Sequence, residues 1–152
     1  MNTSFIKKLM ITNAGLAALA LRIPAAIIFI AHGAQKLFGW FGGYGLEGTA
    51  GWMASIGLEP GMLMATLAGS AEFFGGLFLI AGLFVRPAAL VLAATMVVAI
   101  LTVHLGNGLF MANNGYEFGL ALLVITVGLV FRGAGSLSAD RLLQARLANQ
   151  AL

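Results

Sequence analysis

Ionisable side chains inside apolar segments are the residues of this chain most able to do chemistry. Glu72 lies near the middle of the apolar run 67–83. An ionisable group in a segment that can span a membrane is costly, so it indicates a functional site. Gly69 and Gly76 stand three and four residues from Glu72 on the same helical face, where small residues let a second helix approach. The spacing predicts that Glu72 points into packed protein.

Four further groups fall at a similar depth. At 1.5 Å per residue, Glu72 and Glu117 lie roughly 20 Å from the predicted cytoplasmic ends of their helices. His32 and His104 lie roughly 25 Å from those ends. Lys36 is on the same helix face as His32, one turn further out. We therefore expect a polar cluster in the outer half of the molecule.

Two other residues are expected to contribute to this site. Arg22 lies deeper, roughly 12 Å from the cytoplasmic end, and its long side chain predicts an ion pair with Glu72. Tyr116 and Glu117 follow the uncharged loop 106–115. The purely apolar part of the helix that follows has only about 14 residues, fewer than the roughly 20 of a span. Tyr116 and Glu117 are therefore predicted to lie below the outer surface, beside a cavity that opens outward.

A histidine and a glutamate between apolar walls suit a quinone or a phenol. The histidine would donate a hydrogen bond to a carbonyl oxygen, and the glutamate would carry protons. A metal site is not predicted, because no HxxxH or HExxH spacing is present and Lys36 would repel a cation. Haem between His32 and His104 remains an alternative.

Each of these residues also has a purely structural interpretation. The pair of Arg22 and Glu72 would fix the register of two helices. Lys36 would extend to the outer lipid headgroups, and the histidines would form hydrogen bonds at the interface. Glu117 would cap the start of its helix. The coincidence of five ionisable groups at one level favours a small-molecule or proton site.

The composition predicts a polytopic membrane protein. Of 152 residues, 61% are hydrophobic and 9% are charged, and the mean hydropathy is +1.00. The absence of cysteine excludes disulfides, CxxC redox chemistry, thiolate metal sites and cysteine nucleophiles. The net charge of +3 is scattered along the chain, which argues against nucleic-acid binding.

The elements that must position the site form an all-α fold in one domain, residues 1–152. We expect a four-helix bundle with helices at about 14–38, 61–84, 88–105 and 117–131, followed by an amphipathic tail at 138–148. The basic residues outside the predicted spans fall on one side, which places both termini in the cytoplasm of a multi-pass inner-membrane protein. They are Lys7, Lys8, Arg86, Arg132, Arg141 and Arg146.

A weak internal repeat is also present. Arg22-Ile-Pro-Ala-Ala leads to His32-Gly33, and Arg86-Pro-Ala-Ala leads to His104-Leu-Gly106. The repeat predicts two parallel helical hairpins, an arrangement that often places a site at the interface between the repeats.

The motifs resemble those of the DoxX family of small bacterial membrane proteins, over residues from about Leu21 to Asp140. The motifs that carry the resemblance are His32-Gly-Ala-Gln-Lys36-Leu-Phe-Gly39, Ala71-Glu72-Phe-Phe-Gly-Gly76, Val103-His104-Leu-Gly-Asn107-Gly108, Asn113-Asn-Gly-Tyr116-Glu117 and Gly133-Ala-Gly135-x-x-Ser138-x-Asp140. The resemblance implies a four-helix inner-membrane protein. The family takes its name from a membrane subunit associated with thiosulfate–quinone oxidoreduction, and other members are linked to quinones or oxidative stress.

The leading hypothesis is a quinone-linked membrane redox protein, or an accessory subunit of a membrane oxidoreductase. Glu72 and Glu117 would handle protons, and His32 and His104 would orient the ligand. The cofactor-binding set comprises Lys36, Arg22 and Tyr116. The alternatives are a transporter or exporter of aromatic or weakly acidic compounds, and a structural assembly factor. The expected partners are the lipid bilayer, a small apolar ligand, and either a second copy or a redox subunit.

Overall fold

The computed structural model describes residues 15–149. All regular secondary structure in that part of the chain is helical. The all-α prediction is therefore confirmed for these residues. Residues 1–14, which include Lys7, Lys8 and the predicted start of the first helix, and residues 150–152 lie outside them. The α-helices are α2 (Ala17–Phe38), α3 (Gly45–Ser55), α4 (Gly61–Ala81), α5 (Val85–Ala99), α6 (Glu117–Arg132) and α7 (Ala139–Asn149). The short elements are the 3-10 helices η1 (Trp40–Gly42), η3 (Leu105–Asn107) and η4 (Met111–Asn113), and the π-helical segment η2 (Ile100–His104).

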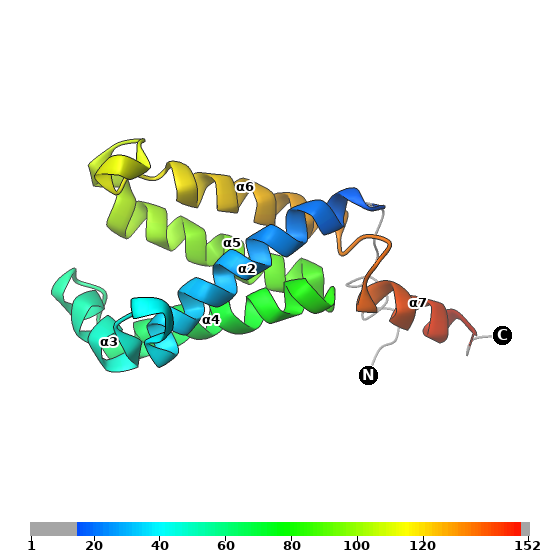
Figure 1. The fold of residues 1–152 in the computed structure, drawn as a ribbon, viewed down its shortest axis with the longest axis horizontal. Helices are drawn as coiled ribbons and strands as arrows, with labels where there is room; N and C mark the ends of the chain where they lie inside the picture. The colour runs from blue at the N-terminus through cyan, green and yellow to red at the C-terminus, as the bar shows by residue number, and fades with distance from the viewer. Residues whose placement is uncertain (1–14, 150–152) are drawn as a thin grey trace.

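The long helices run roughly along one direction, with α3 at one end of the molecule and α7 at the other (Figure 1). We call these the α3 end and the α7 end. Helix α2 packs against α4, α5 packs against α6, and α4 also contacts α5. This pairing is the one expected from the weak repeat, while the repeat itself stays a prediction.

Three segments are long and apolar enough to cross a membrane by length and composition. They are Ala17–Phe38, Gly61–Ala81 and Val85–Asn107, the last comprising α5, η2 and η3. Helix α6 has 16 residues, fewer than the roughly 20 that a span needs. Its role as a fourth span therefore stays a prediction.

The turn between α4 and α5 lies earlier than the sequence indicates. Residues 82–84 form it, and α5 begins at Val85, so Arg86 and Pro87 stand in the first helical turn. Proline is accepted there because its missing N–H has no intrahelical partner in the first turn.

Glycines on the facing sides of α2 and α4 allow the two backbones to come close. A Cβ at Gly33 of α2 would lie 2.8 Å from the Cα of Phe73 in α4. Gly69 and Gly76 on α4 face side chains of α2 at similarly short range. The helices can therefore meet closely enough for short polar contacts between them.

We predict that Gly33→Ala lowers stability, because the new methyl group would meet the backbone of α4. Overpacking of this kind typically costs about 1–3 kcal/mol. The matched control is Gly51→Ala in α3, where no heavy atom lies within 4 Å of the position of the new methyl. Thermal unfolding in detergent, followed by circular dichroism, should show a lower midpoint only for Gly33→Ala. Equal midpoints for the two variants would contradict the packing argument.

Candidate functional site

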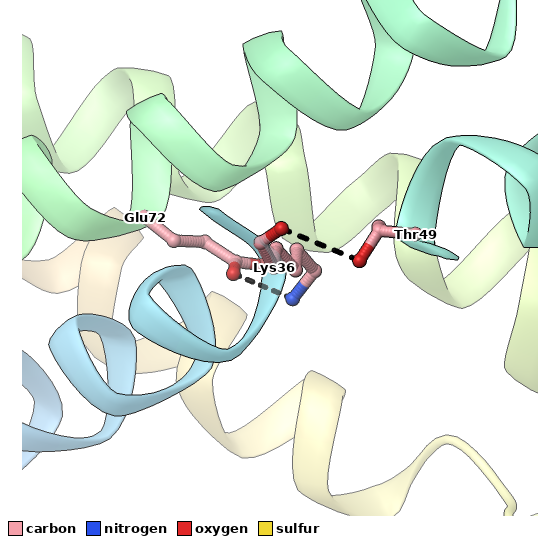
Figure 2. Close-up of polar contacts among 3 residues, drawn as sticks. All are labelled: Lys36, Thr49 and Glu72. Carbon is pink, nitrogen blue, oxygen red and sulfur yellow. Dashed lines mark hydrogen bonds and ion pairs between the residues drawn. The ribbon is translucent and has the colours of Figure 1, made fainter. Parts of the chain in front are cut away.

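The site is centred on an ion pair between α2 and α4. The ammonium of Lys36 lies 2.6 Å from Oε2 of Glu72. The Glu72 side chain is 5% exposed and that of Lys36 is 23% exposed, so the pair is largely shielded from solvent. Thr49 of α3 donates a hydrogen bond of 3.4 Å to the backbone carbonyl of Lys36, as Figure 2 shows. Three helices therefore fix the position of one charged pair.

The predicted pair between Arg22 and Glu72 is wrong, because Glu72 pairs with Lys36 instead. Arg22 and Lys36 are 14 residues apart on α2, roughly 21 Å along the helix axis. The alternative interpretation, in which Lys36 extends to the headgroups, is wrong for the same reason. The side chain turns inward to the carboxylate of Glu72 (Figure 2).

A cavity of about 800 Å³ surrounds this pair, at the α3 end of the molecule. Four of the candidate residues line it, namely His32, Lys36, Glu72 and His104. Much of the remaining lining is apolar or aromatic and includes Phe29, Trp52, Met53, Met96, Phe118 and Leu122. Ligand sites commonly have this volume and this combination of apolar walls with a few polar groups.

The two histidines are held in different ways. The ring of His32 lies 6.3 Å, centroid to centroid, from the ring of Phe118 on α6. Nδ1 of His104 lies 2.9 Å from the backbone carbonyl oxygen of Asn114. A carbonyl oxygen only accepts hydrogen bonds, so Nδ1 must carry the proton. In the neutral ring, Nε2 of His104 is then an acceptor.

The π-helical segment Ile100–His104 helps to position His104. A π-helical turn contains more residues than an α-helical turn, so it changes the direction of the side chains that follow, and such segments are frequent at functional sites. Asn107 also donates a hydrogen bond of 3.3 Å to the carbonyl of Asn114. The segment and the loop after it are thereby joined beside the cavity.

The other three candidates, Glu117, Tyr116 and Arg22, are not among the residues that line the cavity. Oε1 of Glu117 accepts a hydrogen bond of 2.6 Å from the backbone N–H of Met111, so its carboxylate holds the preceding loop. Tyr116 is partly buried, and its backbone N–H donates to the carbonyl of Gly108. Arg22 lies nearer the α7 end. In residues 15–149, no three acidic or histidine side chains are grouped closely enough to hold a metal ion.

A second polar cluster closes the α7 end. The guanidinium of Arg22 donates to the carbonyls of Ala134, at 2.5 Å, and of Leu137, at 2.8 Å. Asp140 accepts hydrogen bonds from the backbone N–H groups of Phe84 and Val85, at 2.7 and 3.1 Å. Burial raises the pKa of the Asp140 carboxyl, and the two N–H donors and the charge of Arg22 act in the opposite direction.

Asp140 is therefore a structural residue, at a position where the sequence predicts only an amphipathic tail. The available signal is its place in the motif Gly133-Ala-Gly135-x-x-Ser138-x-Asp140, which follows the last predicted span. Phe118 and Trp52 of the cavity lining were also missed. For Phe118 the signal is its four-residue spacing from Leu122, which puts both on one face of α6.

Comparison with known proteins assigns the chain to a family. The DoxX family model matches residues 17–105, which include Lys36, Glu72 and both histidines. The chain belongs to the DoxX family. No solved structure matches it.

Three bacterial proteins are similar over most of the chain. A Bacillus subtilis protein named "Putative oxidoreductase CatD" is 35% identical over 122 residues, covering 80% of this chain and 83% of its own. Two uncharacterized proteins of Haemophilus influenzae are 36% identical over 123 residues and 30% identical over 140 residues. They cover 79% and 87% of this chain, and 85% and 86% of their own lengths. Family membership and the three apolar segments together identify a membrane protein.

Proposed function

We propose that this DoxX protein binds a quinone-like ligand in the cavity, as a quinone-linked redox protein or an accessory subunit of one. The observation that carries the proposal is the shared lining of one apolar cavity by the pair of Lys36 and Glu72 and by His32 and His104. A quinone ring needs apolar walls and hydrogen-bonding groups for its two oxygens. The cavity offers both.

The proposed orientation has α6 as a fourth span and the α7 end in the cytoplasm of a bacterium, with the protein in the inner membrane. Arg86, Arg132, Arg141 and Arg146 belong to the first turn of α5, the last turn of α6, and α7, all at the α7 end. Such a bias of basic residues is typical of the cytoplasmic side. The cavity would then face the outer half of the membrane.

The cavity residues can treat the two redox forms of a quinone differently. The Lys36 ammonium has three N–H donors, and the bond to Glu72 uses one, so another can serve a quinone carbonyl. His104, with Nδ1–H bound to Asn114, offers an acceptor to the hydroxyl of a quinol. This differs from the donor role expected from the sequence. We propose that Glu72 and His104 accept the two protons that a quinol releases on oxidation.

In this proposal, a redox cofactor of a partner subunit accepts the two electrons that the quinol releases. The chain has no cysteine that could hold an iron–sulfur cluster. The name of the Bacillus subtilis relative refers to an oxidoreductase, which supports a redox role for a related protein. This chain would then bind the quinone and handle its protons.

Transport of an aromatic compound is the second candidate, favoured by the size of the cavity. Fully buried side chains of Leu79, Leu92 and Leu129, and the cluster around Arg22, lie between the cavity and the α7 end. A transport cycle would have to separate all of these contacts. Binding at the α3 end requires no such change, so we favour the redox proposal.

The proposal predicts saturable quenching of Trp52 by a quinone. Trp52 lines the cavity, and Trp40→Phe leaves it as the sole tryptophan of the chain. The test is a titration of the Trp40→Phe protein in lipid nanodiscs with decyl-ubiquinone, followed by tryptophan fluorescence. A bound quinone gives a quenching curve that saturates. Quenching that rises linearly with quinone, as for collisions within the lipid, would contradict the proposal.

A further inference from the structure

The helices α4 and α5 touch near the α7 end and separate toward the α3 end. A Cβ at Gly75 of α4 would lie 3.0 Å from the side chain of Leu92 on α5, so the helices are in contact at this level. Seven residues further out, Ala68 on α4 and Ala99 on α5 both line the cavity. Figure 1 shows the two helices diverging from the turn that joins them. The cavity therefore extends between their outer halves.

The edge formed by α5 and η2 at this gap comprises Thr95 and Val98 of α5 and Thr102 of η2, which all line the cavity. Val98 is 50% exposed, so it also forms part of the outer surface. The hydroxyls of Thr95 and Thr102 donate to backbone carbonyls of their own helix, at 3.0 and 2.8 Å. The polar atoms of this edge are therefore satisfied within the helix, as a surface facing lipid requires.

The position of this edge can be deduced from the contacts on either side of α5. A Cβ at Gly119 of α6 would meet Ile100, so Ile100 marks the side that faces α6. Leu92 marks the side that faces α4. At 100° per residue, Thr95 and Val98 lie beyond Leu92, on the side away from Ile100. The edge thus belongs to the gap between α4 and α5.

Two aromatic rings occupy the opposite side of the cavity, between α2 and α6. There the ring of Phe118 on α6 lies 6.3 Å from the ring of His32 on α2, and both line the cavity. These two rings bridge α2 and α6 at the level of the polar groups. The gap between α4 and α5 presents small and β-branched side chains instead.

We propose that this gap is a lateral portal, through which a lipid-dissolved quinone with a long apolar tail reaches the cavity. The ring would lie among Lys36, Glu72 and His104, and the tail would extend past Ala68 and Val98 into the membrane. The inference rests on the proposed function and adds the class of ligand, a tailed quinone rather than a small water-soluble phenol. It also specifies that the ligand enters from the membrane and not from water.

The test uses a portal variant, in which Val98→Phe and Thr102→Phe are combined in the Trp40→Phe protein to narrow the gap. The matched control is Val97→Phe with Leu101→Phe, which has the same spacing on the same helix at exposed positions outside the cavity lining. Stopped-flow quenching of Trp52 in nanodiscs measures association of decyl-ubiquinone. We expect about tenfold slower association for the portal variant, because the ring must displace two added phenyl groups. The control should match the parent.

The same ring without its tail, a dimethoxy-methyl-benzoquinone, serves as the second ligand. Saturable quenching of Trp52 by this compound in the portal variant shows that the cavity is intact. Slower association of the tailed quinone alone then supports the portal. Unchanged association of decyl-ubiquinone in the portal variant overturns the portal while leaving the proposed function in place. Absence of saturable quenching by either quinone in the parent overturns both.

Discussion

Glu72→Gln is expected to weaken quinone binding by at least about tenfold. A hydrogen bond to a charged group contributes about 1.5–3 kcal/mol, and 1.4 kcal/mol corresponds to a tenfold change in the dissociation constant. The amide removes the negative charge that holds the Lys36 ammonium at 2.6 Å in the wild-type protein. It also removes a proton acceptor from the cavity. The measurement is the Trp52 quenching titration in nanodiscs, with the Trp40→Phe protein as parent.

The fold is expected to survive this change. Breaking a fully buried ion pair costs about 3–5 kcal/mol, but Lys36 is 23% exposed, and glutamine can still accept a hydrogen bond from it. The matched control is Glu47→Gln, an exposed carboxylate of α3 that does not line the cavity. Equal quinone affinity in the two folded variants would refute the role of Glu72. A helical and monodisperse Glu72→Gln protein that has lost saturable quenching would support it.

Arg22→Met is expected to be the most destabilising single change at the α7 end. It leaves the carbonyls of Ala134 and Leu137 without their donor, and it removes the positive charge near the buried Asp140. Loss of one partner from a buried polar cluster costs about 3–5 kcal/mol. For a chain of this size, that loss corresponds to a decrease of about 6–20 °C in the thermal midpoint.

Arg22→Lys separates charge from geometry. Lysine keeps the charge, but a single ammonium cannot reproduce the fork with which arginine reaches two carbonyls. We expect it to recover only part of the thermal midpoint measured by circular dichroism in detergent. Arg146→Met, on the exposed surface of α7, is the control and should unfold like the wild type. An Arg22→Met protein as stable as this control would show that the cluster contributes nothing to the fold.

Much of the architecture can be predicted from hydrophobicity alone. Apolar runs of sufficient length predict membrane helices, and three such segments are present in residues 15–149. The spacing of Gly69 and Gly76 around Glu72 predicts a close neighbouring helix, and α2 lies there. These predictions succeed because they depend on local periodicity, which an isolated helix already has.

The partner of Glu72 could not be predicted in the same way. Arg22 and Lys36 lie on one face of α2, so helical periodicity cannot choose between them. The choice depends on the axial position of α2 relative to α4. Contacts such as that of Gly33 with Phe73 set this position. The contacts of Arg22 with Ala134 and Leu137 join residues more than a hundred positions apart, and no local pattern indicates them.

The direction of His104 illustrates a third limit. A regular helix through residues 85–105 would give its side chain a different direction from the one it has after the π-helical segment Ile100–His104. Apolar sequence around residue 100 carries no signal for that extra residue. The acceptor role that we assign to His104 depends on its bond to Asn114, which only the folded loop provides.

The most direct test of the central claim is native mass spectrometry of the protein released gently from bacterial membranes. We predict a bound species with the mass of a membrane quinone on the wild-type protein. The same species should be absent from, or much reduced in, the folded Glu72→Gln variant, and retained by Glu47→Gln. A wild-type protein without such a species, or equal amounts on wild type and Glu72→Gln, would contradict a quinone site formed by Lys36, Glu72 and His104.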